Sequence, residues 1–401
     1  MRILFITWDA PETSYLESLF LPIFAGLKAK GISTDVLQFR WATKALTAKT
    51  AEACQAQGIG YRAAPIWRTF GGAGAMVSAS LGRIAIRKAI QHFKPDALMP
   101  RSLMPAWATL IAGADHLLPV VFDADGLAID ERVEFAGLSP TGVTYRVLRD
   151  IEAQMVRKSI STIVRSSQAA DILLHRAGPP VTSARFHVVA NGRDDGVFRP
   201  GNDAQRQTVR RELGIAETAP VIVYAGSVGQ QYRFDQLSGF ARTVLDRRPD
   251  ARLLVLTNAP DQAKASLAQS DPKVVQASLV LTVQPLDVPR YLACADIGTA
   301  FRDSSFSMKA VAPIKLAEYL LCGLPVVGTS DIGDTRDAIL AGLFFDEAQG
   351  LDVAAEWFID RVLPYRLEFR ERARHIGITN FSLSRSVQGY YDALEPLRSL
   401  D

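Results

Sequence analysis

The sequence has few of the residues that build metal centres, disulfide frameworks and thiol active sites. Its three cysteines lie far apart without a CxxC pair, and none of its five histidines has metal-ligand spacing to another. A zinc site and a disulfide framework are therefore not indicated, and we expect reduced, buried thiols. No convincing Ser-His-Asp or Cys-His arrangement is present either, and the three scattered cysteines give no reason to propose a thiol nucleophile.

The sequence also lacks a strong charge bias and a long apolar run. A formal charge of +3 over 401 residues is too small to imply nucleic-acid binding, so we expect no nucleic-acid partner. No apolar segment approaches the roughly 20 residues of a membrane helix. Asp9 and Glu12 interrupt the apolar start at Met1–Trp8, which therefore predicts a buried strand rather than a secretion signal. We expect a cytoplasmic protein, soluble or peripherally associated with the inner face of the cytoplasmic membrane.

The rest of the composition is that of an ordinary globular protein. Along the sequence, predicted strands and predicted helices alternate. Such alternation predicts parallel sheets with helices on both faces, the α/β class. The predicted strands of the first half are Arg2–Thr7, Thr34–Phe39, Asp96–Met99, Val120–Asp123, Thr162–Arg165 and Phe186–Val189. Those of the second half are Val221–Ala225, Arg252–Thr257, Ser278–Thr282, Ile297–Ala300 and Pro325–Val327. A polar break at Gly201–Asp203 predicts a domain boundary near Arg199–Asp203. Because ligands of such sheets bind beyond the carboxyl ends of strands, the residues after each strand are the candidates for chemistry.

The segment Pro313–Gly328 has the features of an anion-binding helix start. Pro313 suits the first turn of a helix, whose free N–H groups attract an anion such as a diphosphate. Glu318 lies too deep in the helix to cap it, and its carboxylate is suited to accept hydrogen bonds from two ribose hydroxyls. Gly323 ends the helix, and a buried strand over Leu324–Val327 follows.

Two further segments carry turn and glycine signals at predicted strand ends. Asn191-Gly192 begins the rarer pattern Asn-Gly-x-Asp-x-x-x-Phe-x-Pro, which ends at Pro200. Gly226-Ser-Val-Gly229 follows a strand, where glycine permits close backbone approach and successive N–H groups form an anion nest. For each short motif taken alone, the alternative is a simple turn that binds no ligand.

Together with Tyr224–Asp235 and Val288–Gly298, these segments resemble the family 4-type glycosyltransferases, and the matches cover nearly the whole chain. Phe122–Arg132 is similar to a loop found in one branch of these enzymes. The resemblance implies the GT-B fold, in which two Rossmann-like domains with parallel sheets face each other across a cleft. Residues 1–200 would bind the acceptor, residues 201–380 the nucleotide sugar, and a helix in 381–401 would cross back toward the first domain. The resemblance also implies no essential metal and no cofactor.

The family's functional positions can be carried over one at a time. Glu318 matches the second glutamate of the family's Glu-x7-Glu motif, which binds the ribose of the sugar nucleotide. The first glutamate falls at Ala310 and is missing, so its neighbours Lys309 and Ser307 are candidates for contacting the sugar. The position of the family's basic residue, six after the loop glycine, is occupied by Tyr232. The predicted donor-binding residues are Gly226, Ser227, Gly229, Lys309, Pro313, Ile314 and Glu318.

Arg233, beside Tyr232, is our choice for the cation that binds the diphosphate, because a planar guanidinium fork suits phosphate oxygens. Lys315 is the second candidate for this cation. For both residues, the alternative is a charged side chain that is exposed to solvent and binds no ligand. We predict three catalytic residues, which are Arg233, Lys315 and Asp123. Asp123-Ala-Asp125 resembles the metal signature of a different glycosyltransferase fold, but it lies in the first domain, so no metal is expected. Four residues are predicted to line the acceptor side, namely Arg101, Asp125, Glu131 and Arg132. An ion-pair network that only holds this loop is the alternative.

The resemblance implies transfer of a sugar from a nucleoside-diphosphate sugar to a hydroxyl acceptor with retention of anomeric configuration. A lipid-linked glycan or polysaccharide precursor is the expected acceptor. The missing glutamate at Ala310 leaves room for a catalytically silent binding subunit, and a sugar-nucleotide epimerase is a further alternative. Ser80–Lys94 predicts a basic amphipathic helix, which either lies on an anionic membrane or packs on the sheet with a solvated basic face.

Overall fold

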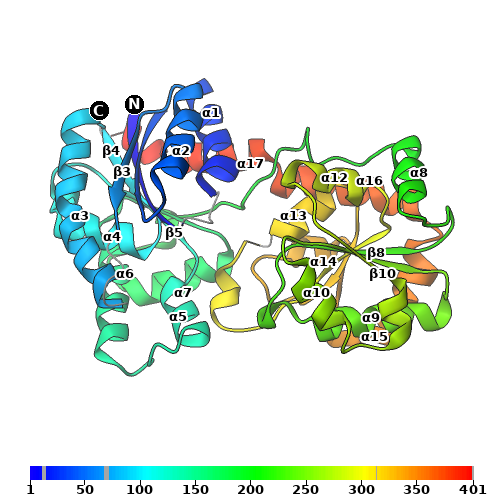
Figure 1. The fold of residues 1–401 in the computed structure, drawn as a ribbon. Helices are drawn as coiled ribbons and strands as arrows, with labels where there is room; N and C mark the ends of the chain where they lie inside the picture. Colours follow the sequence, from blue (N-terminus) through cyan, green and yellow to red (C-terminus); the bar gives the residue numbers. More distant parts are fainter. Residues whose placement is uncertain (11–14, 67–71, 313, 400–401) are drawn as a thin grey trace. The chain divides into compact units, whose positions relative to one another are not determined.

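The computed structural model describes residues 1–10, 15–66, 72–312 and 314–399, with the backbone alone at 72–76 and 230. The chain forms two compact units, each built on a parallel sheet (Figure 1). Unit 1 contains Met1–Ala190, Ser305–Ala312 and Ser386–Asp401, and unit 2 contains Asn191–Ser304 and Pro313–Arg385. The predicted division into an acceptor domain and a donor domain concerns function and stays a prediction.

The sheet of unit 1 has the strand order β3-β2-β1-β4, and a second sheet has the order β5-β6-β7. Parallel bridges from Leu98 to Val120 and from Arg101 to Asp123 join the two sheets between β4 and β5. All strand pairs are parallel. The strands are β1 (Arg2–Asp9), β2 (Ser33–Arg40), β3 (Tyr61–Pro65), β4 (Ala97–Pro100), β5 (Val121–Asp125), β6 (Ser161–Val164) and β7 (Phe186–Val188).

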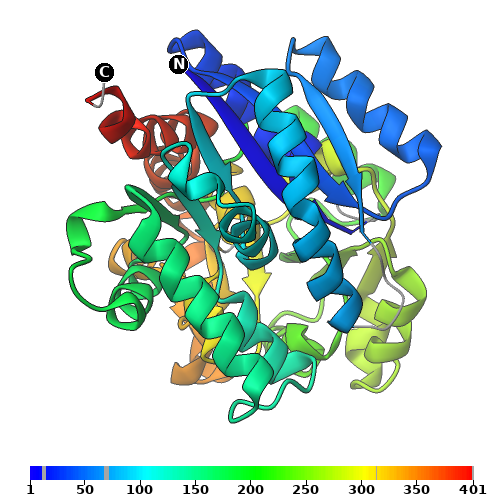
Figure 2. The same ribbon diagram turned by 90° about the vertical axis from the view of Figure 1, so that its left-hand side faces the viewer.

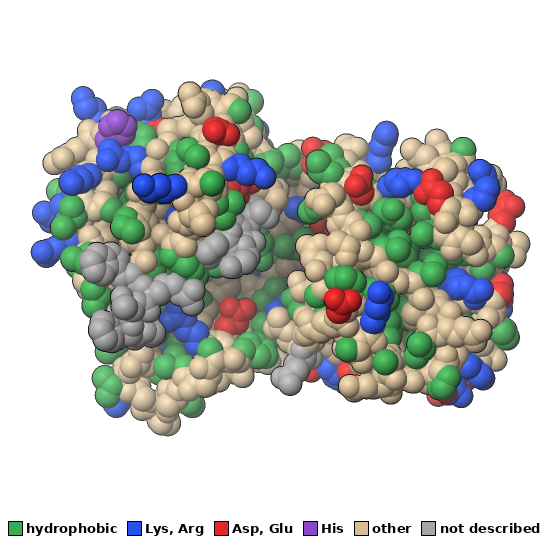
Figure 3. Space-filling view, viewed as in Figure 1, with side chains coloured by type: hydrophobic (Ala, Val, Ile, Leu, Met, Phe, Trp, Pro, Cys, Tyr) green, Lys and Arg blue, Asp and Glu red, His purple; other side chains and the backbone are tan. Residues whose placement is uncertain are grey.

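Helices cover both faces of this sheet. They are α1 (Leu21–Ala29), α2 (Lys44–Ala56), α3 (Gly72–Phe93), α4 (Leu103–Ile111), α5 (Ala128–Phe135), α6 (Val143–Lys158) and α7 (Ser167–Ala177). The last helices, α17 (Leu383–Ala393) and α18 (Glu395–Arg398), follow at the end of the chain. Helix α3 lies on the outside of unit 1 (Figure 2), and Lys, Arg and hydrophobic side chains alternate along this outer edge (Figure 3).

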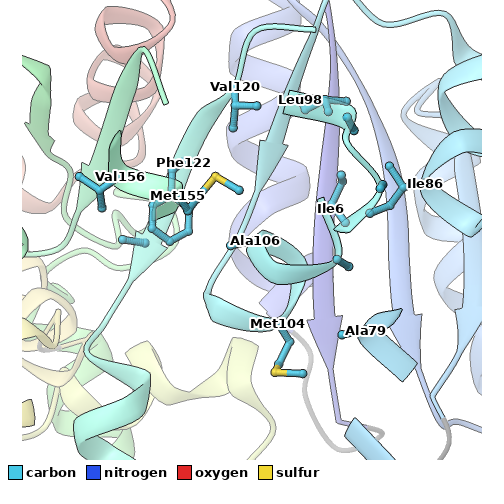
Figure 4. Packing of buried hydrophobic residues seen from close by; sticks show 14 of the residues in the cluster. Ile6, Ala79, Ile86, Leu98, Met104, Ala106, Val120, Phe122, Met155 and Val156 are labelled. Atoms are coloured by element: carbon cyan, nitrogen blue, oxygen red, sulfur yellow. The ribbon is translucent and has the colours of Figure 1, made fainter. Parts of the chain in front are cut away.

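The larger core of unit 1 lies between the sheet and the helices α3, α4, α6 and α7. Ile6, Leu98 and Phe122 extend from neighbouring strands toward Ile86 of α3 and Met155 of α6 (Figure 4). These apolar residues are fully buried, and their removal from water stabilises the unit by about 25 cal/mol for each Å² of apolar surface. The core fixes the strand ends on which the polar residues of unit 1 lie.

Unit 2 contains a single parallel sheet of order β10-β9-β8-β11-β12-β13. Its strands are β8 (Val221–Ala225), β9 (Arg252–Leu256), β10 (Ser278–Leu281), β11 (Ile297–Ala300), β12 (Val326–Gly328) and β13 (Phe344–Asp346). The direction in which strands are added reverses between β8 and β11. Such a switch point is where open α/β sheets bind ligands, beyond the carboxyl ends of the strands.

The helices of unit 2 also lie on both faces of its sheet. Helix α13 packs against α16 on one face, and α9 packs against α15 on the other. The helices are α8 (Asp203–Glu212), α9 (Phe234–Arg247), α10 (Pro260–Leu267), α11 (Pro272–Ala277), α12 (Val288–Leu292), α13 (Ile314–Leu321), α14 (Arg336–Leu340), α15 (Leu351–Trp357) and α16 (Arg366–Phe381).

The predicted α/β class with two parallel-sheet, Rossmann-like units is confirmed, and every predicted strand is present within two residues of its predicted ends. The predicted polar break at Gly201–Asp203 leads directly into α8, which begins at Asp203. The Asn202 side chain accepts a hydrogen bond from Gln205 N, and the Gln205 side chain accepts one from Asn202 N. This capping box begins the helix.

Two strands were not predicted. β3 is an edge strand with a single buried residue, Ala64, and β13 has only three residues, so neither gives a strong pattern. None of the helices in the described ranges combines the length and the apolar character needed to cross a membrane.

Candidate functional site

A pocket of about 320 Å³ opens at the carboxyl edge of the unit 2 sheet. Its volume lies in the range of about 300–1,000 Å³ that is common for small-molecule sites. Residues that follow β8, β9 and β10 line it together with Glu318 of α13. The lining residues are Arg193, Ala225, Gly226, Ser227, Val228, Leu256, Thr257, Asn258, Ala259, Val283, Pro285, Val288 and Glu318.

The glycine loop after β8 depends on a glycine at only one of its two predicted positions. Gly226 has a φ of 145°, and a Cβ atom there would lie 2.4 Å from Lys315 Cε and 2.9 Å from its Nζ. Gly229 has an extended φ of 167°, and its Cβ would meet only Tyr232 Cδ2 at 3.8 Å. Gly226 therefore lets Lys315 approach the end of β8, whereas Gly229 is not required by its backbone conformation.

Lys315 extends from α13 into an aromatic environment beside this loop. Its Nζ donates a hydrogen bond to Tyr224 Oη at 2.6 Å and lies 3.9 Å from the ring centre of Tyr224 and 4.4 Å from that of Tyr232. No carboxylate in the described part of the chain forms an ion pair with it. Burial and the nearby Arg302 guanidinium lower the pKa of Lys315 to about 7, and Glu318 opposes this only weakly.

Arg302, just after β11, is a second cation at this edge that the sequence analysis did not single out. Its guanidinium stacks on the Tyr232 ring at 5.5 Å, and its Nη2 lies 3.5 Å from Gln231 Oε1. Its Nε is buried and has no hydrogen-bond partner among the described residues. Two cations without a carboxylate partner favour an anionic ligand, because such a ligand would supply the missing hydrogen-bond acceptors and charge.

Glu318 lines the pocket and forms an ion pair with Arg193, whose Nη2 lies 2.9 Å from Glu318 Oε1. Burial raises the pKa of Glu318, and Arg193 partly offsets this shift. Backbone hydrogen bonds from Arg193 N to Phe381 O and from Leu383 N to Arg193 O fix this position. Arg193 was missed, although it follows the Asn191-Gly192 turn that the sequence analysis marked.

Arg233, the first choice for the diphosphate cation, does not line the pocket itself, and neither do Lys315 and Arg302. It has a φ of 40°, donates to Asp235 at 3.1 Å and lies 3.7 Å from Asp303. The hydrogen bond to Asp235 is the main cause of its raised pKa. The structure thus brings Lys315 rather than Arg233 to the glycine loop, while the catalytic role of either residue stays a prediction.

Among the other predicted donor-binding residues, Ser227 lines the pocket and its carbonyl accepts a hydrogen bond from Tyr224 Oη. Ile314 begins α13. Pro313 lies outside the described residues.

The segment Ser305–Ala312 contains the position of the missing glutamate, and it belongs to unit 1. Glu134 of α5 accepts hydrogen bonds from Ser305 Oγ at 2.7 Å and Ser307 N at 3.1 Å, and also from Ser307 Oγ. Ser166 Oγ donates to the Lys309 carbonyl at 2.6 Å. Neither Glu134 nor Ser166 was singled out from the sequence.

Ala310 is fully buried and is part of the apolar core of unit 1. A glutamate at this position would bury a carboxylate among apolar groups, which is costly without a partner. A glutamate therefore does not fit at this position as the chain is packed here. Lys309 lies 5.8 Å from the ring centre of Phe306. The sugar contacts expected of Lys309 and Ser307 stay predictions.

The polar residues at the carboxyl edge of unit 1 are paired with one another. Asp123, 0% exposed, accepts hydrogen bonds from Arg165 Nη2 at 2.7 and 2.8 Å and from Tyr390 Oη at 2.6 Å. Arg101 Nη2 lies 2.6 Å from Asp125 Oδ2, and Arg165 Nε lies 3.4 Å from Asp125 Oδ1. Burial would raise the pKa of Asp125, but Arg101 and Arg165 together lower it.

These contacts are those of the ion-pair network that was the alternative to an acceptor site, and the catalytic role of Asp123 stays a prediction. Asp125 has a φ of 62°, which places its side chain between the two arginines at some backbone cost. On α5, Glu131 is exposed, and Arg132 is half-buried with a pKa lowered by burial. Within the described ranges, no group of three or more His, Cys, Asp or Glu side chains could hold a metal ion.

The glycine loop, Lys315 and Glu318 lie in a part of the chain that matches a known family. Residues 219–360 match the model of the glycosyl transferases of group 1. The match covers the glycine loop and α13 but only part of the chain. The resemblance to the family 4-type glycosyltransferases that the sequence indicated is thereby confirmed.

Similar proteins are found among curated proteins and solved structures. A D-inositol 3-phosphate glycosyltransferase of Jonesia denitrificans is 31% identical over 221 residues, which are 52% of this chain and 50% of that protein. The chain thus spans about half the length of this curated relative.

Two solved structures share the fold over the whole chain. A glycosyltransferase from Rickettsia africae ESF-5 has a TM-score of 0.74 at 15% identity, with 100% of both chains covered. HepE from Anabaena in complex with UDP-glucose has a TM-score of 0.68 at 16% identity, again with 100% of both chains covered. At such identities the likeness shows the GT-B fold alone.

Proposed function

We propose that this protein binds a nucleoside-diphosphate sugar in the unit 2 pocket and transfers the sugar to a hydroxyl acceptor with retention of anomeric configuration. The observation that carries the proposal is a pair of cations that have no ion pair with a carboxylate in the described part of the chain. Lys315 lies against Gly226, which lines the 320 Å³ pocket, and Arg302 lies against the Tyr232 ring. A diphosphate supplies the negative charge and the acceptor oxygens that these two cations lack.

The lining of the pocket suggests how the donor lies. The diphosphate contacts the backbone N–H groups after Gly226, with Lys315 and Arg302 as its cations. The ribose hydroxyls donate to the Glu318 carboxylate, which Arg193 orients at 2.9 Å. The base then lies toward Thr257–Ala259 and the segment after β10, in the part of the pocket that has no charged side chain. HepE in complex with UDP-glucose makes UDP-sugars the first donors to test.

Transfer requires stabilisation of the departing diphosphate. Breaking the bond at the anomeric carbon builds negative charge on the diphosphate, and preorganised cations and N–H donors lower the barrier by stabilising that charge. With retention, the acceptor hydroxyl attacks the face from which the diphosphate leaves. The leaving phosphate takes the acceptor proton, so no strong protein base is required near the sugar.

The proposed acceptor is a lipid-linked glycan or polysaccharide precursor, reached at the surface of an anionic membrane. The support is the outer face of α3, where Val77, Leu81 and Ile84 follow one another at helical spacing and are 49%, 46% and 49% exposed. Arg83 and Lys88 are exposed on the same helix. An apolar stripe flanked by basic residues is the pattern of helices that lie in the membrane interface.

The membrane contact is tested by sedimentation with phosphatidylglycerol vesicles and with phosphatidylcholine vesicles. The wild type is expected to sediment with the anionic vesicles only, and Leu81→Glu to stay in the supernatant. The matched control is Leu340→Glu, because Leu340 is an exposed leucine that belongs to unit 2 and not to α3. Equal binding of both variants would show that α3 is not the contact.

The donor is tested by a thermal-shift and calorimetric screen of UDP-, GDP-, ADP- and dTDP-sugars, because a bound ligand raises the unfolding temperature. A UDP-sugar is expected to bind, and slow release of UDP from it is expected in the absence of acceptor. Glu318→Ala is expected to weaken binding. Binding without any turnover would favour the silent binding subunit, and no binding by any sugar nucleotide would contradict the proposal.

A further inference from the structure

Tyr224 is a fully buried tyrosine near the carboxyl end of β8, and its hydroxyl joins two parts of the candidate donor site. The hydroxyl accepts a hydrogen bond from Lys315 Nζ at 2.6 Å and donates one to the carbonyl of Ser227. Burial raises the pKa of Tyr224, so the hydroxyl keeps its proton near neutral pH and remains a donor. One oxygen atom therefore connects the cation from α13 with the glycine loop after β8.

The contact with Tyr224 limits how the Lys315 ammonium group can turn. The stem of Lys315 lies against Gly226, where a Cβ atom would approach Lys315 Cε to 2.4 Å. The rings of Tyr224 and Tyr232 have their centres 3.9 and 4.4 Å from Nζ. An ammonium group has three N–H donors, and in the described part of the chain only the one directed at Tyr224 Oη has a hydrogen-bond acceptor. The other two donors are thereby held in fixed directions and are left for a ligand.

The second hydrogen bond of Tyr224 sets the orientation of the glycine loop. In a planar trans peptide unit, the C=O group and the N–H group that follows it point in opposite directions. Because the Ser227 carbonyl turns toward Tyr224, the Val228 N–H turns away from it. Ser227 and Val228 both line the pocket, and their N–H groups donate to no acceptor within the described ranges. Without the bond to Tyr224, the Ser227 carbonyl is free to turn toward the ligand, where it would repel a phosphate.

We propose that Tyr224 is a positioning residue of the donor site, which orients the Lys315 ammonium group and the glycine loop for the diphosphate of the sugar nucleotide. The inference rests on the proposed function and assigns a role within the same site. Tyr224 does not line the pocket, so it acts through Lys315 and Ser227. A tyrosine with a purely structural role would stabilise the fold without affecting how Lys315 binds a proton, and this difference makes the role testable.

The test is calorimetric titration of the full chain with UDP-glucose between about pH 5.5 and 8.5. Tyr224→Phe removes the hydroxyl and keeps the ring. The variant is expected to bind about tenfold more weakly, because a hydrogen bond to a charged group is lost. Loss of the acceptor oxygen also destabilises the ammonium form of Lys315, while the nearby charges of Arg302 and Glu318 are unchanged. The pH above which affinity falls is therefore expected to be lower in Tyr224→Phe than in the wild type.

Tyr319→Phe is the matched control. Tyr319 Oη accepts a hydrogen bond from Ala225 N at 2.8 Å, so this buried tyrosine supports the end of the same strand through a contact that does not involve Lys315. The control is expected to lower the unfolding temperature, because it leaves the Ala225 N–H without its acceptor. It is expected to show the same pH dependence of UDP-glucose affinity as the wild type.

A crystal structure of the wild type with UDP-glucose gives a second measurement, which does not depend on the folding of a variant. A phosphate oxygen is expected within about 3.2 Å of Lys315 Nζ, with the hydrogen bond to Tyr224 retained.

Three results would overturn the role of Tyr224 and leave the donor pocket in place. They are wild-type affinity in Tyr224→Phe, an equal loss of affinity at every pH, and a complex in which Lys315 has left Tyr224. If the wild type binds no UDP-glucose, the proposed donor pocket itself is contradicted, and the role of Tyr224 with it.

Discussion

The carboxyl edges of the parallel sheets in unit 1 and unit 2 both carry charged residues, yet they differ in how those charges are paired. In unit 1, Asp123 and Asp125 share Arg165 and Arg101 in a closed network. In unit 2, Lys315 and Arg302 have aromatic neighbours instead of carboxylates, beside an open pocket. The comparison teaches that the pairing of charges, and not their position at a strand end, separates structural residues from candidate ligand-binding residues.

The largest expected effect concerns the ion-pair network of unit 1. Asp123→Ala leaves Arg165 as a buried charge without its main partner, and such a loss typically costs about 3–5 kcal/mol. We therefore expect a clearly lower unfolding temperature, measured by circular dichroism, and a smaller decrease for Asp123→Asn, which keeps hydrogen bonds to Arg165 and Tyr390. An inactive Asp123→Asn protein with unchanged thermal stability would instead support the predicted catalytic role.

The second prediction tests the candidate donor pocket of unit 2 through its glycine loop. Gly226→Ala places a methyl group against Lys315 at a strained φ, so donor affinity is expected to fall about tenfold to a hundredfold, as for a strain of about 1–3 kcal/mol. Gly229→Ala is the matched control in the same loop, because its φ is extended and its Cβ has room. Calorimetry with UDP-glucose measures both. Equal losses in the two variants would show that Lys315 does not need the space at Gly226.

The contrast also explains which residues of the candidate site could be predicted from the sequence. Gly226, Lys315 and Glu318 were predictable because each lies next to a strand or helix end whose position follows from local patterns. Arg302 and Arg193 lie equally close to predicted strand ends, but their importance depends on Tyr232 and Glu318, which approach them only in the folded chain. Local sequence patterns predict where a residue lies along the fold, whereas its interaction partners depend on tertiary contacts.

The dependence on tertiary contacts also explains why some interactions in unit 1 were not predicted from the sequence. Ala310 was identified as a missing glutamate, but the apolar core around it is built by residues from distant parts of the chain. The hydrogen bonds from Ser305 and Ser307 to Glu134 likewise join residues more than 170 positions apart. The Asn202–Gln205 capping box is by contrast a local signal, which could have been predicted from the sequence alone.

The third prediction concerns pH. With a pKa of about 7, Lys315 is largely neutral above neutrality in the empty site, whereas a bound diphosphate favours its charged form. Donor binding then requires proton uptake, so affinity for UDP-glucose is expected to fall by up to about tenfold for each pH unit above 7. Calorimetry between pH 6.5 and about 8.5, with UDP-glucose as a donor whose diphosphate does not titrate in this range, measures the slope.

Lys315→Arg provides the control for this slope, because arginine stays charged throughout the range and should flatten the dependence. The stability of the ligand-free protein gives a second check with a definite sign. Above pH 7 the folded state holds fewer protons at Lys315 than the unfolded state, so the contribution of this residue to stability increases as pH rises. A wild-type affinity that does not change with pH would show that Lys315 is not the cation of the diphosphate.

The smallest expected effect is that of Arg233, the cation that the sequence favoured. Its guanidinium is one-third exposed and already paired with Asp235, and exposed pairs of this kind contribute about 0–1 kcal/mol. Arg233→Ala is therefore expected to change donor affinity by less than about fivefold, whereas Arg302→Ala, which removes a partly buried cation, should have a larger effect. Calorimetry with UDP-glucose compares the two variants directly. A greater loss for Arg233→Ala would mean that the donor draws Arg233 away from Asp235, and that carboxylate pairing in the empty site is a poor guide to which cation binds the ligand.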